Sequence, residues 1–137
     1  MKRLMKMLDY KVIVHYHNPK GDYFSYDLWQ WQTNKWGKEA SFSKLDYFGI
    51  QGELSFKTSE PLGQAHVIVK RSDWSSQSCD YHIDLLPAHL PTEVWLIEGD
   101  HQVYYSLQSA TTSHQYSQRR PHNFDVAMRS DYFDECW

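Results

Sequence analysis

Two tryptophans, Trp29 and Trp31, stand two residues apart in the stretch Tyr26-Asp27-Leu28-Trp29-Gln30-Trp31. Successive side chains of a β-strand point to opposite faces, so both indoles share one face with Asp27 and lie about 6.5 Å apart along the strand. Such a pair forms a continuous apolar platform. A pyranose packs its C–H faces on indole rings, and its rim hydroxyls then need polar partners. The pair therefore favours carbohydrate binding.

The same spacing leaves the opposite assignment open, with both indoles in the core and Leu28 facing solvent. Leu28 suits the core of a small sandwich better than a pair of indoles does. This difference favours the outward placement of Trp29 and Trp31.

In the segments that must position these residues, residue types alternate with a period of two, as in β-strands. Runs rich in β-branched and aromatic residues alternate with turn signals every 8 to 12 residues, and no convincing amphipathic helix is found. The pattern predicts an all-β, immunoglobulin-like antiparallel β-sandwich of seven or eight short strands. The expected strands are residues 10–17, 26–32, 40–44, 50–57, 65–71, 81–85, 93–97 and 102–105, the last two joined as a hairpin.

The chain of 137 residues has the size of one ordinary domain. We assign residues 10–106 to the β-sandwich and residues 1–9 to an N-terminal extension. Residues 107–125 are polar and aperiodic, which indicates a linker. Residues 126–137 become apolar again and are interpreted as the start of a following domain or as a C-terminal strap.

The composition narrows the classes of partner. A net charge of −3 disfavours a nucleic-acid partner, which would require clustered Lys and Arg. Aromatic residues make up 16% of the chain, more than one core needs, and this excess points to recognition. No secretory signal or long apolar run is present, and the two cysteines are expected to be free thiols. These features predict a cytoplasmic chain without a membrane partner.

Several segments, in order, resemble the pullulanase-associated domain, which is carbohydrate-binding module family 41. The family opens with a His-Tyr-His strand, a Pro-x-Gly-Asp-Tyr turn and a Leu-Trp-x-Trp strand, which are found here as residues 15–23 and 28–31. The likeness continues at residues 46–49, 67–74, 80–84, 93–100 and 103–105. It covers about residues 11–106. Residues 130–135 further resemble the point where type I pullulanases enter their next domain.

The resemblance implies a non-catalytic module that binds α-1,4- and α-1,6-linked glucose chains such as glycogen, starch, pullulan and malto-oligosaccharides. It implies no cofactor. The family's paired tryptophans fall on Trp29 and Trp31, its loop aspartate on Asp80, and its Trp-containing loop on Trp74. The family's lysine falls near Gln77, where this chain departs, and Lys70 or Arg71 could substitute.

The resemblance also implies that the module serves an attached catalytic part. It would bring a pullulanase-type debranching enzyme of glycoside hydrolase family 13 to its substrate, the two being covalently linked in a longer parent chain.

Two other classes of function remain as alternatives. A metal-dependent enzyme could use His15 and His17, which share a strand face, together with His66 or His82. A protein- or single-strand nucleic-acid-binding module could use the aromatic face, since exposed rings also stack on bases.

Overall fold

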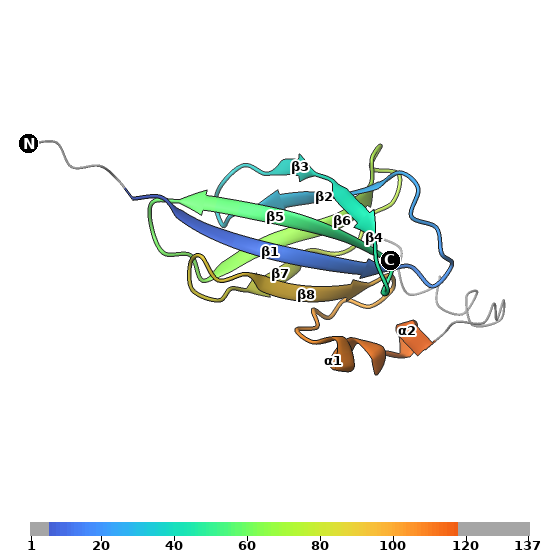
Figure 1. Ribbon diagram of the computed structural model, residues 1–137. Helices are drawn as coiled ribbons and strands as arrows, with labels where there is room; N and C mark the ends of the chain where they lie inside the picture. The colour runs from blue at the N-terminus through green and yellow to red at the C-terminus, as the bar shows by residue number, and fades with distance from the viewer. Residues whose placement is uncertain (1–5, 118–137) are drawn as a thin grey trace, which may run out of the picture.

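The computed structural model describes residues 6–117, which fold into two four-stranded sheets packed face to face (Figure 1). Sheet A has the strand order β4-β5-β1-β8 and sheet B the order β3-β2-β6-β7. Sheet A consists of β4 (Phe42–Leu45), β5 (Ile50–Thr58), β1 (Leu8–His17) and β8 (Thr92–Ile97). Sheet B consists of β3 (Lys38–Ala40), β2 (Tyr26–Trp31), β6 (Gln64–Arg71) and β7 (Tyr81–Asp84). The predicted β-sandwich is confirmed.

Most pairings are antiparallel, but β1 and β8 pair in parallel, with Val14 opposite Val94. The predicted strand at residues 102–105 contributes only one bridge, between Trp95 and Tyr104. β8 is therefore held in sheet A by β1, which is remote in sequence, rather than by the hairpin predicted from the sequence.

The predicted strand at residues 40–44 is divided between the two sheets. β3 ends at Ala40 in sheet B, and β4 begins at Phe42 in sheet A opposite Gly52. A Cβ atom on Gly52 would lie 3.2 Å from the carbonyl oxygen of Ser41, so the absence of a side chain there lets the crossing chain approach β5. A register irregularity of the β-bulge kind follows in β4, between Phe42 and Lys44.

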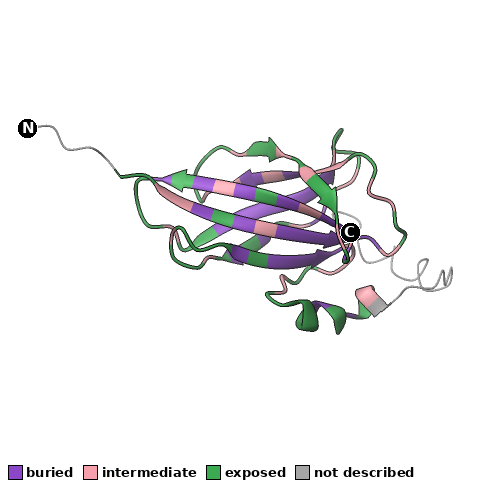
Figure 2. Cartoon of the chain, viewed as in Figure 1, coloured by how far each residue is buried: buried purple, intermediate pink, exposed green. Residues whose placement is uncertain are grey.

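The core lies between the two sheets and follows the alternation of the strands (Figure 2). Along the whole of β5, buried residues alternate with exposed or half-buried ones. The residues with no exposed surface in this core include Val12, Val14, Tyr16, Leu28, Val67, Val69, Ile83, Val94 and Leu96. Burial of side chains of this size stabilises the fold by about 1.5–3 kcal/mol each.

Residues 107–117, which the sequence assigns to a linker, form two short helices, α1 (Leu107–Thr111) and α2 (His114–Ser117). They lie beside the end of β8 in Figure 1. Ala110 packs with Phe48, Trp95 and Ile97 in a second apolar cluster. Neither helix has the length or apolar content needed to cross a membrane. The rest of the predicted linker and residues 126–137 lie outside the described residues.

Cys79 is disulfide-bonded, so the expectation of a free thiol at this position is wrong. A free thiol at Cys79 was one of the grounds for predicting a reducing compartment, and that ground is removed.

Candidate functional site

Trp29 and Trp31 lie on the outer face of sheet B and are both half-buried. Their neighbours on β2, Leu28 and Gln30, are turned inward, and Leu28 belongs to the core. The alternative that places the two indoles in the core is therefore excluded. Alternate side chains of β2 point to opposite faces of sheet B. Because the face that carries Leu28 fills the space between the sheets, Trp29 and Trp31 must lie on the other face.

The strand register places further side chains on this outer face. On β6, Ile68 pairs with Trp29, His66 with Trp31, and Lys70 with Asp27. On β3, Glu39 pairs with Trp29, and on β7, His82 pairs with His66. The face thus combines two indoles with carboxylate, ammonium and imidazole groups.

Trp74 brings a third indole to the face from the loop between β6 and β7. Its ring meets that of Trp29 edge-on, with 5.7 Å between centroids, and 41% of the residue is exposed. The backbone of Trp74 has a φ of 64°, a left-handed conformation that is costly for a bulky residue. The loop enforces it: the amide of Trp74 donates to the carbonyl of Arg71, and that of Ser78 to the carbonyl of Val69.

Lys70 fixes the underside of this loop although it has no exposed surface. Its Nζ lies 2.7 Å from Asp27 Oδ1 and 3.0 Å from Glu39 Oε2, and 4.5 Å from the centroid of the Trp74 ring. Burial alone would lower the pKa of Lys70, but the hydrogen bonds to Asp27 and Glu39 outweigh burial and raise it. The cation therefore joins β2, β3, β6 and the indole of Trp74.

Trp31 stacks on His66, which is one of two hydrogen-bonded histidines. The ring of His66 stacks with that of Trp31 at 5.3 Å, and its Nδ1 lies 2.8 Å from His82 Nδ1, so one of the two nitrogens donates to the other. Thr33 Oγ1 lies 2.6 Å from His66 Nε2. Burial and the neighbouring His82 lower the pKa of His66, against an opposing contribution from Asp80. The neutral imidazole is thus the favoured form beneath Trp31.

The turn between β2 and β3 also approaches Trp29 closely. A Cβ atom on Gly37 would lie 2.3 Å from Nε1 of Trp29, so only glycine permits this contact. Trp29 is consequently held between the turn on one side and Trp74 on the other.

Residues 10–105 match the family model of the bacterial pullanase-associated domain. The chain belongs to this family. Its fold is similar to the streptococcal family 41 carbohydrate-binding modules from virulence factors, described for α-glucan recognition, with 18% identity and a TM-score of 0.54. It is also similar to SpuA, a multi-modular glycogen-degrading pneumococcal virulence factor, with 17% identity and a TM-score of 0.53.

Each comparison covers 70% of this chain. The chain matches 47% of the first of these structures and 10% of the second. The predicted family is confirmed. The pullanase-associated domain is a non-catalytic module that is associated with pullulanases.

Within this pullanase-associated domain, all five residues predicted for the site lie at or beside the outer face of sheet B. Gln77 forms a bridge with Lys70, which puts it next to the cation rather than in place of it. Asp80 is exposed and precedes β7, close enough to act on the pKa of His66. Trp29, Trp31 and Trp74 form the aromatic part.

The sequence analysis did not assign three features of the domain to the candidate site. Lys70 was considered only as a possible substitute for a ligand-contacting lysine, whereas the structure buries it. The histidines His66 and His82 were weighed only as metal ligands. Trp36, which is 97% exposed in the turn between β2 and β3, was given no role in the sequence analysis. The alternation of side chains along β6 puts His66, Ile68 and Lys70 on one face, which was the available signal for the histidines but does not reveal that Lys70 is buried.

The histidines of the metal alternative do not converge in this domain. His15 and His17 belong to β1 of sheet A, whereas His66 and His82 belong to sheet B. His15 contacts Asp46 Oδ2 at 2.6 Å and Glu93 Oε2 at 2.5 Å, and His17 Nδ1 donates to the carbonyl of Phe48. Among residues 6–117, no group of three or more potential ligands is arranged to hold a metal ion.

Proposed function

We propose that this chain binds α-glucan chains, such as glycogen, starch, pullulan and malto-oligosaccharides, on the outer face of sheet B. The observation that supports this most is the placement of Trp29 and Trp31 side by side on that face in a member of the pullanase-associated family. Glucose rings pack on the two indoles through their C–H faces.

Polar groups around the indoles serve the sugar hydroxyls. Asp80 is exposed and Gln77 half-buried, so a carboxylate and an amide stand at the rim. Trp74 adds a ring at an angle of 66° to Trp29, which gives the platform a bend. An α-linked glucose chain curves, and a bent platform follows a curved chain better than a flat one does.

We further propose that the module brings an attached debranching enzyme of the pullulanase type, from glycoside hydrolase family 13, to its substrate. The family description and the small share of multi-modular SpuA that this chain spans support such a covalent arrangement.

Replacement of Trp29 or Trp31 by alanine tests the binding role. Each change should abolish retention in native gels that contain glycogen or pullulan, because it removes one of the two rings on which glucose stacks. Far-UV circular dichroism should stay unchanged, since the indoles are outside the core. Tyr47→Ala is the matched control, because Tyr47 is 68% exposed and contacts His15 on sheet A. Unfolded variants, or retention that persists, would contradict the proposal.

Salt separates this function from nucleic-acid binding. Maltotetraose is neutral, so its affinity, followed by tryptophan fluorescence, should change little with salt. Binding of a single-stranded oligonucleotide would weaken steeply as salt rises, because bound counterions are released. An oligonucleotide that binds in this manner, with maltotetraose ignored, would favour the nucleic-acid alternative.

A further inference from the structure

A pocket of about 360 Å³ opens between the β2–β3 turn and β5, beside the proposed glucan face. Residues 30–32 and 35–38 line it on one side and residues 55–57 on the other. Its volume lies in the lower part of the range of small-molecule sites, about 300–1,000 Å³. Trp31 belongs both to this lining and to the platform, so the two sites adjoin.

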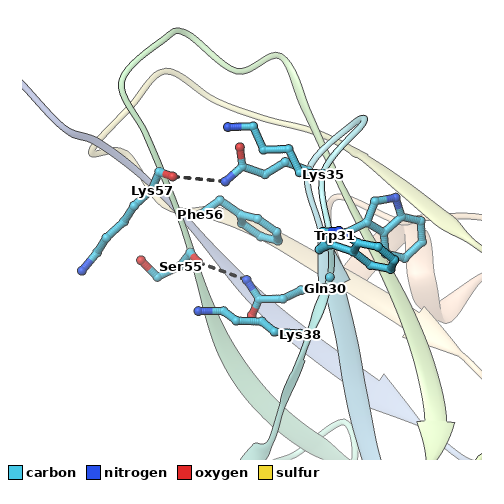
Figure 3. Close-up of a pocket in the computed structure, with 10 residues that line it drawn as sticks. Gln30, Trp31, Lys35, Lys38, Ser55, Phe56 and Lys57 are labelled. Atoms are coloured by element: carbon cyan, nitrogen blue, oxygen red, sulfur yellow. Dashed lines mark hydrogen bonds between the residues drawn. The ribbon is translucent and has the colours of Figure 1, made fainter.

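The walls of the pocket are fixed by hydrogen bonds that join the two sheets. Gln30 Nε2 donates to the carbonyl of Ser55 at 3.1 Å, and Gln32 Nε2 donates to that of Lys57 at 3.1 Å. Figure 3 shows both bonds crossing the gap on either side of the Phe56 ring. Phe56 is 2% exposed and belongs to the core. The pocket is therefore a preformed feature of the fold.

Cations gather at this pocket without acidic partners. Lys35 and Lys38 extend across the gap toward β5, whereas the side chain of Lys57 points away from it (Figure 3). No Asp or Glu lines the pocket, and within residues 6–117 none of these lysines forms an ion pair. The whole chain carries a net charge of −3, so the pocket opposes the overall charge.

A neutral glucan does not require two unpaired ammonium groups at a fixed site. Lysines on an edge hairpin also discourage sheet aggregation, but that task needs only exposure to water and not convergence on a pocket. A phosphate monoester carries a charge of about −1.5 to −2 at neutral pH and offers three acceptor oxygens, which suits two lysines better than a carboxylate does.

We propose that this pocket binds a phosphate monoester on a hexose unit of the α-glucan that crosses the platform. The inference rests on the proposed function. Trp31 stacks on one sugar while Lys35 and Lys38 bind the phosphate carried by that unit or the next. Trp36, at the pocket and 97% exposed, offers a further ring to the sugar chain.

Isothermal titration compares two malto-oligosaccharides of equal length, one of which carries a phosphate monoester. The phosphorylated chain should bind at least roughly tenfold more tightly, because its contacts are charge-assisted hydrogen bonds. This preference should shrink as salt rises. Lys35→Ala/Lys38→Ala should remove the preference and leave binding of the unphosphorylated chain unchanged. Lys11→Ala/Lys44→Ala, which removes two exposed lysines of sheet A, should keep the preference.

Further ligands test whether the phosphate must be carried by a glucan chain. Inorganic phosphate and glucose 6-phosphate should bind more weakly than the phosphorylated chain, since each lacks part of the platform contact. Equal affinity of the wild type for both oligosaccharides overturns the pocket proposal while leaving the proposed function standing. Tighter binding of a single-stranded oligonucleotide than of the phosphorylated chain also overturns it. Failure of both oligosaccharides to bind overturns the proposed function itself.

Discussion

The outer faces of both sheets carry tryptophan, but within residues 6–117 helices cover the tryptophan of one face and leave those of the other partly exposed. On sheet A, Trp95 is 6% exposed and packs with Phe48, Ile97 and Ala110 of α1. Tyr116 of α2 extends this cover by stacking on Phe48, with 5.4 Å between ring centroids. On sheet B, Trp29 and Trp31 are half-buried, and in the described part of the chain loops flank them. The same residue type is therefore buried on one face and partly exposed on the other, where we propose that it contacts the ligand.

Polar groups differ between the faces in the same way. On sheet A, His15 is 2% exposed and has both ring nitrogens on carboxylates, those of Asp46 and Glu93. On sheet B, Asp80 is exposed, and Gln77 is half-buried. A polar group that is already satisfied within the protein, as His15 is, offers a ligand little, because each new bond would replace an existing one.

Replacement of Trp95 by alanine should produce the largest effect on stability and none on binding. Loss of a buried indole costs about 3–5 kcal/mol, measured as the free energy of unfolding in urea. Maltotetraose affinity should be unchanged while the variant is folded. Trp95→Phe is the control: within the described residues Nε1 of Trp95 has no hydrogen-bond partner, so phenylalanine should cost much less. Loss of affinity in folded Trp95→Ala would break the contrast between the faces.

Lys70→Met should reduce both stability and binding, because Lys70 joins the sheet to Trp74. We expect a loss of about 1–3 kcal/mol in the free energy of unfolding, because the carboxylates of Asp27 and Glu39 lose the ammonium group that they contact. The loss stays moderate because water can hydrate the carboxylate of Glu39 instead. Affinity for maltotetraose should fall roughly tenfold, equivalent to about 1.4 kcal/mol, as Trp74 loses its position.

Lys70→Arg decides whether that loss comes from positioning. Arginine keeps the charge and can stack on Trp74, so it should restore most of the affinity. An affinity that stays at the wild-type value in Lys70→Met, despite lower stability, would limit Lys70 to a purely structural role.

The strands and the orientation of β2 were predictable because they depend on local alternation. Leu28 turns inward and the two indoles outward, as a period of two requires. The residues chosen for the site also come together, because Trp74, Gln77 and Asp80 follow β6 in one loop. The ordered family motifs added the functional class, which alternation alone does not contain.

The features that were missed depend on pairings between distant segments. The parallel contact of β1 with β8 joins residues about 80 positions apart, such as Val14 and Val94. The burial of Lys70 requires Asp27 and Glu39 from two other strands, so the sequence of β6 cannot reveal it. The left-handed backbone of Trp74 follows from hydrogen bonds across its loop, in a residue type that rarely adopts it.

Asp80→Ala should have a moderate effect confined to the face of sheet B. An exposed carboxylate that accepts a hydrogen bond from a sugar hydroxyl contributes about 0.5–1.5 kcal/mol, so maltotetraose affinity should fall roughly two- to tenfold. The free energy of unfolding should hardly change. Asp73→Ala provides a control in the same loop, because Asp73 Oδ1 accepts from the amide of Ser75 within the loop itself. Equal losses in both variants would indicate a general loop effect.

The smallest expected effect is a pH dependence of the sheet B face. Because the pKa of His66 is lowered from 6.5 on folding, the unfolded chain binds a proton in the window below 6.5 where the folded chain does not. Stability therefore rises with pH through that window and falls on acidification. His82, Thr33 and the ring of Trp31 face His66. Two acidic residues belong to the neighbouring segment: Asp80 precedes β7 and acts on the pKa of His66, and Asp84 is the last residue of β7.

Protonation of His66 should break its bond with His82 and weaken the support of Trp31, so maltotetraose affinity should decline as the pH falls below about 6.5, the ordinary histidine value from which the pKa of His66 is lowered. His66→Gln should flatten that decline because glutamine does not titrate. His89→Asn, at an exposed histidine whose amide donates to the carbonyl of Asp9 in β1 of sheet A, should leave it intact. If His66→Gln keeps the wild-type pH profile, the support beneath Trp31 does not depend on the charge of His66, and acid sensitivity arises elsewhere in the fold.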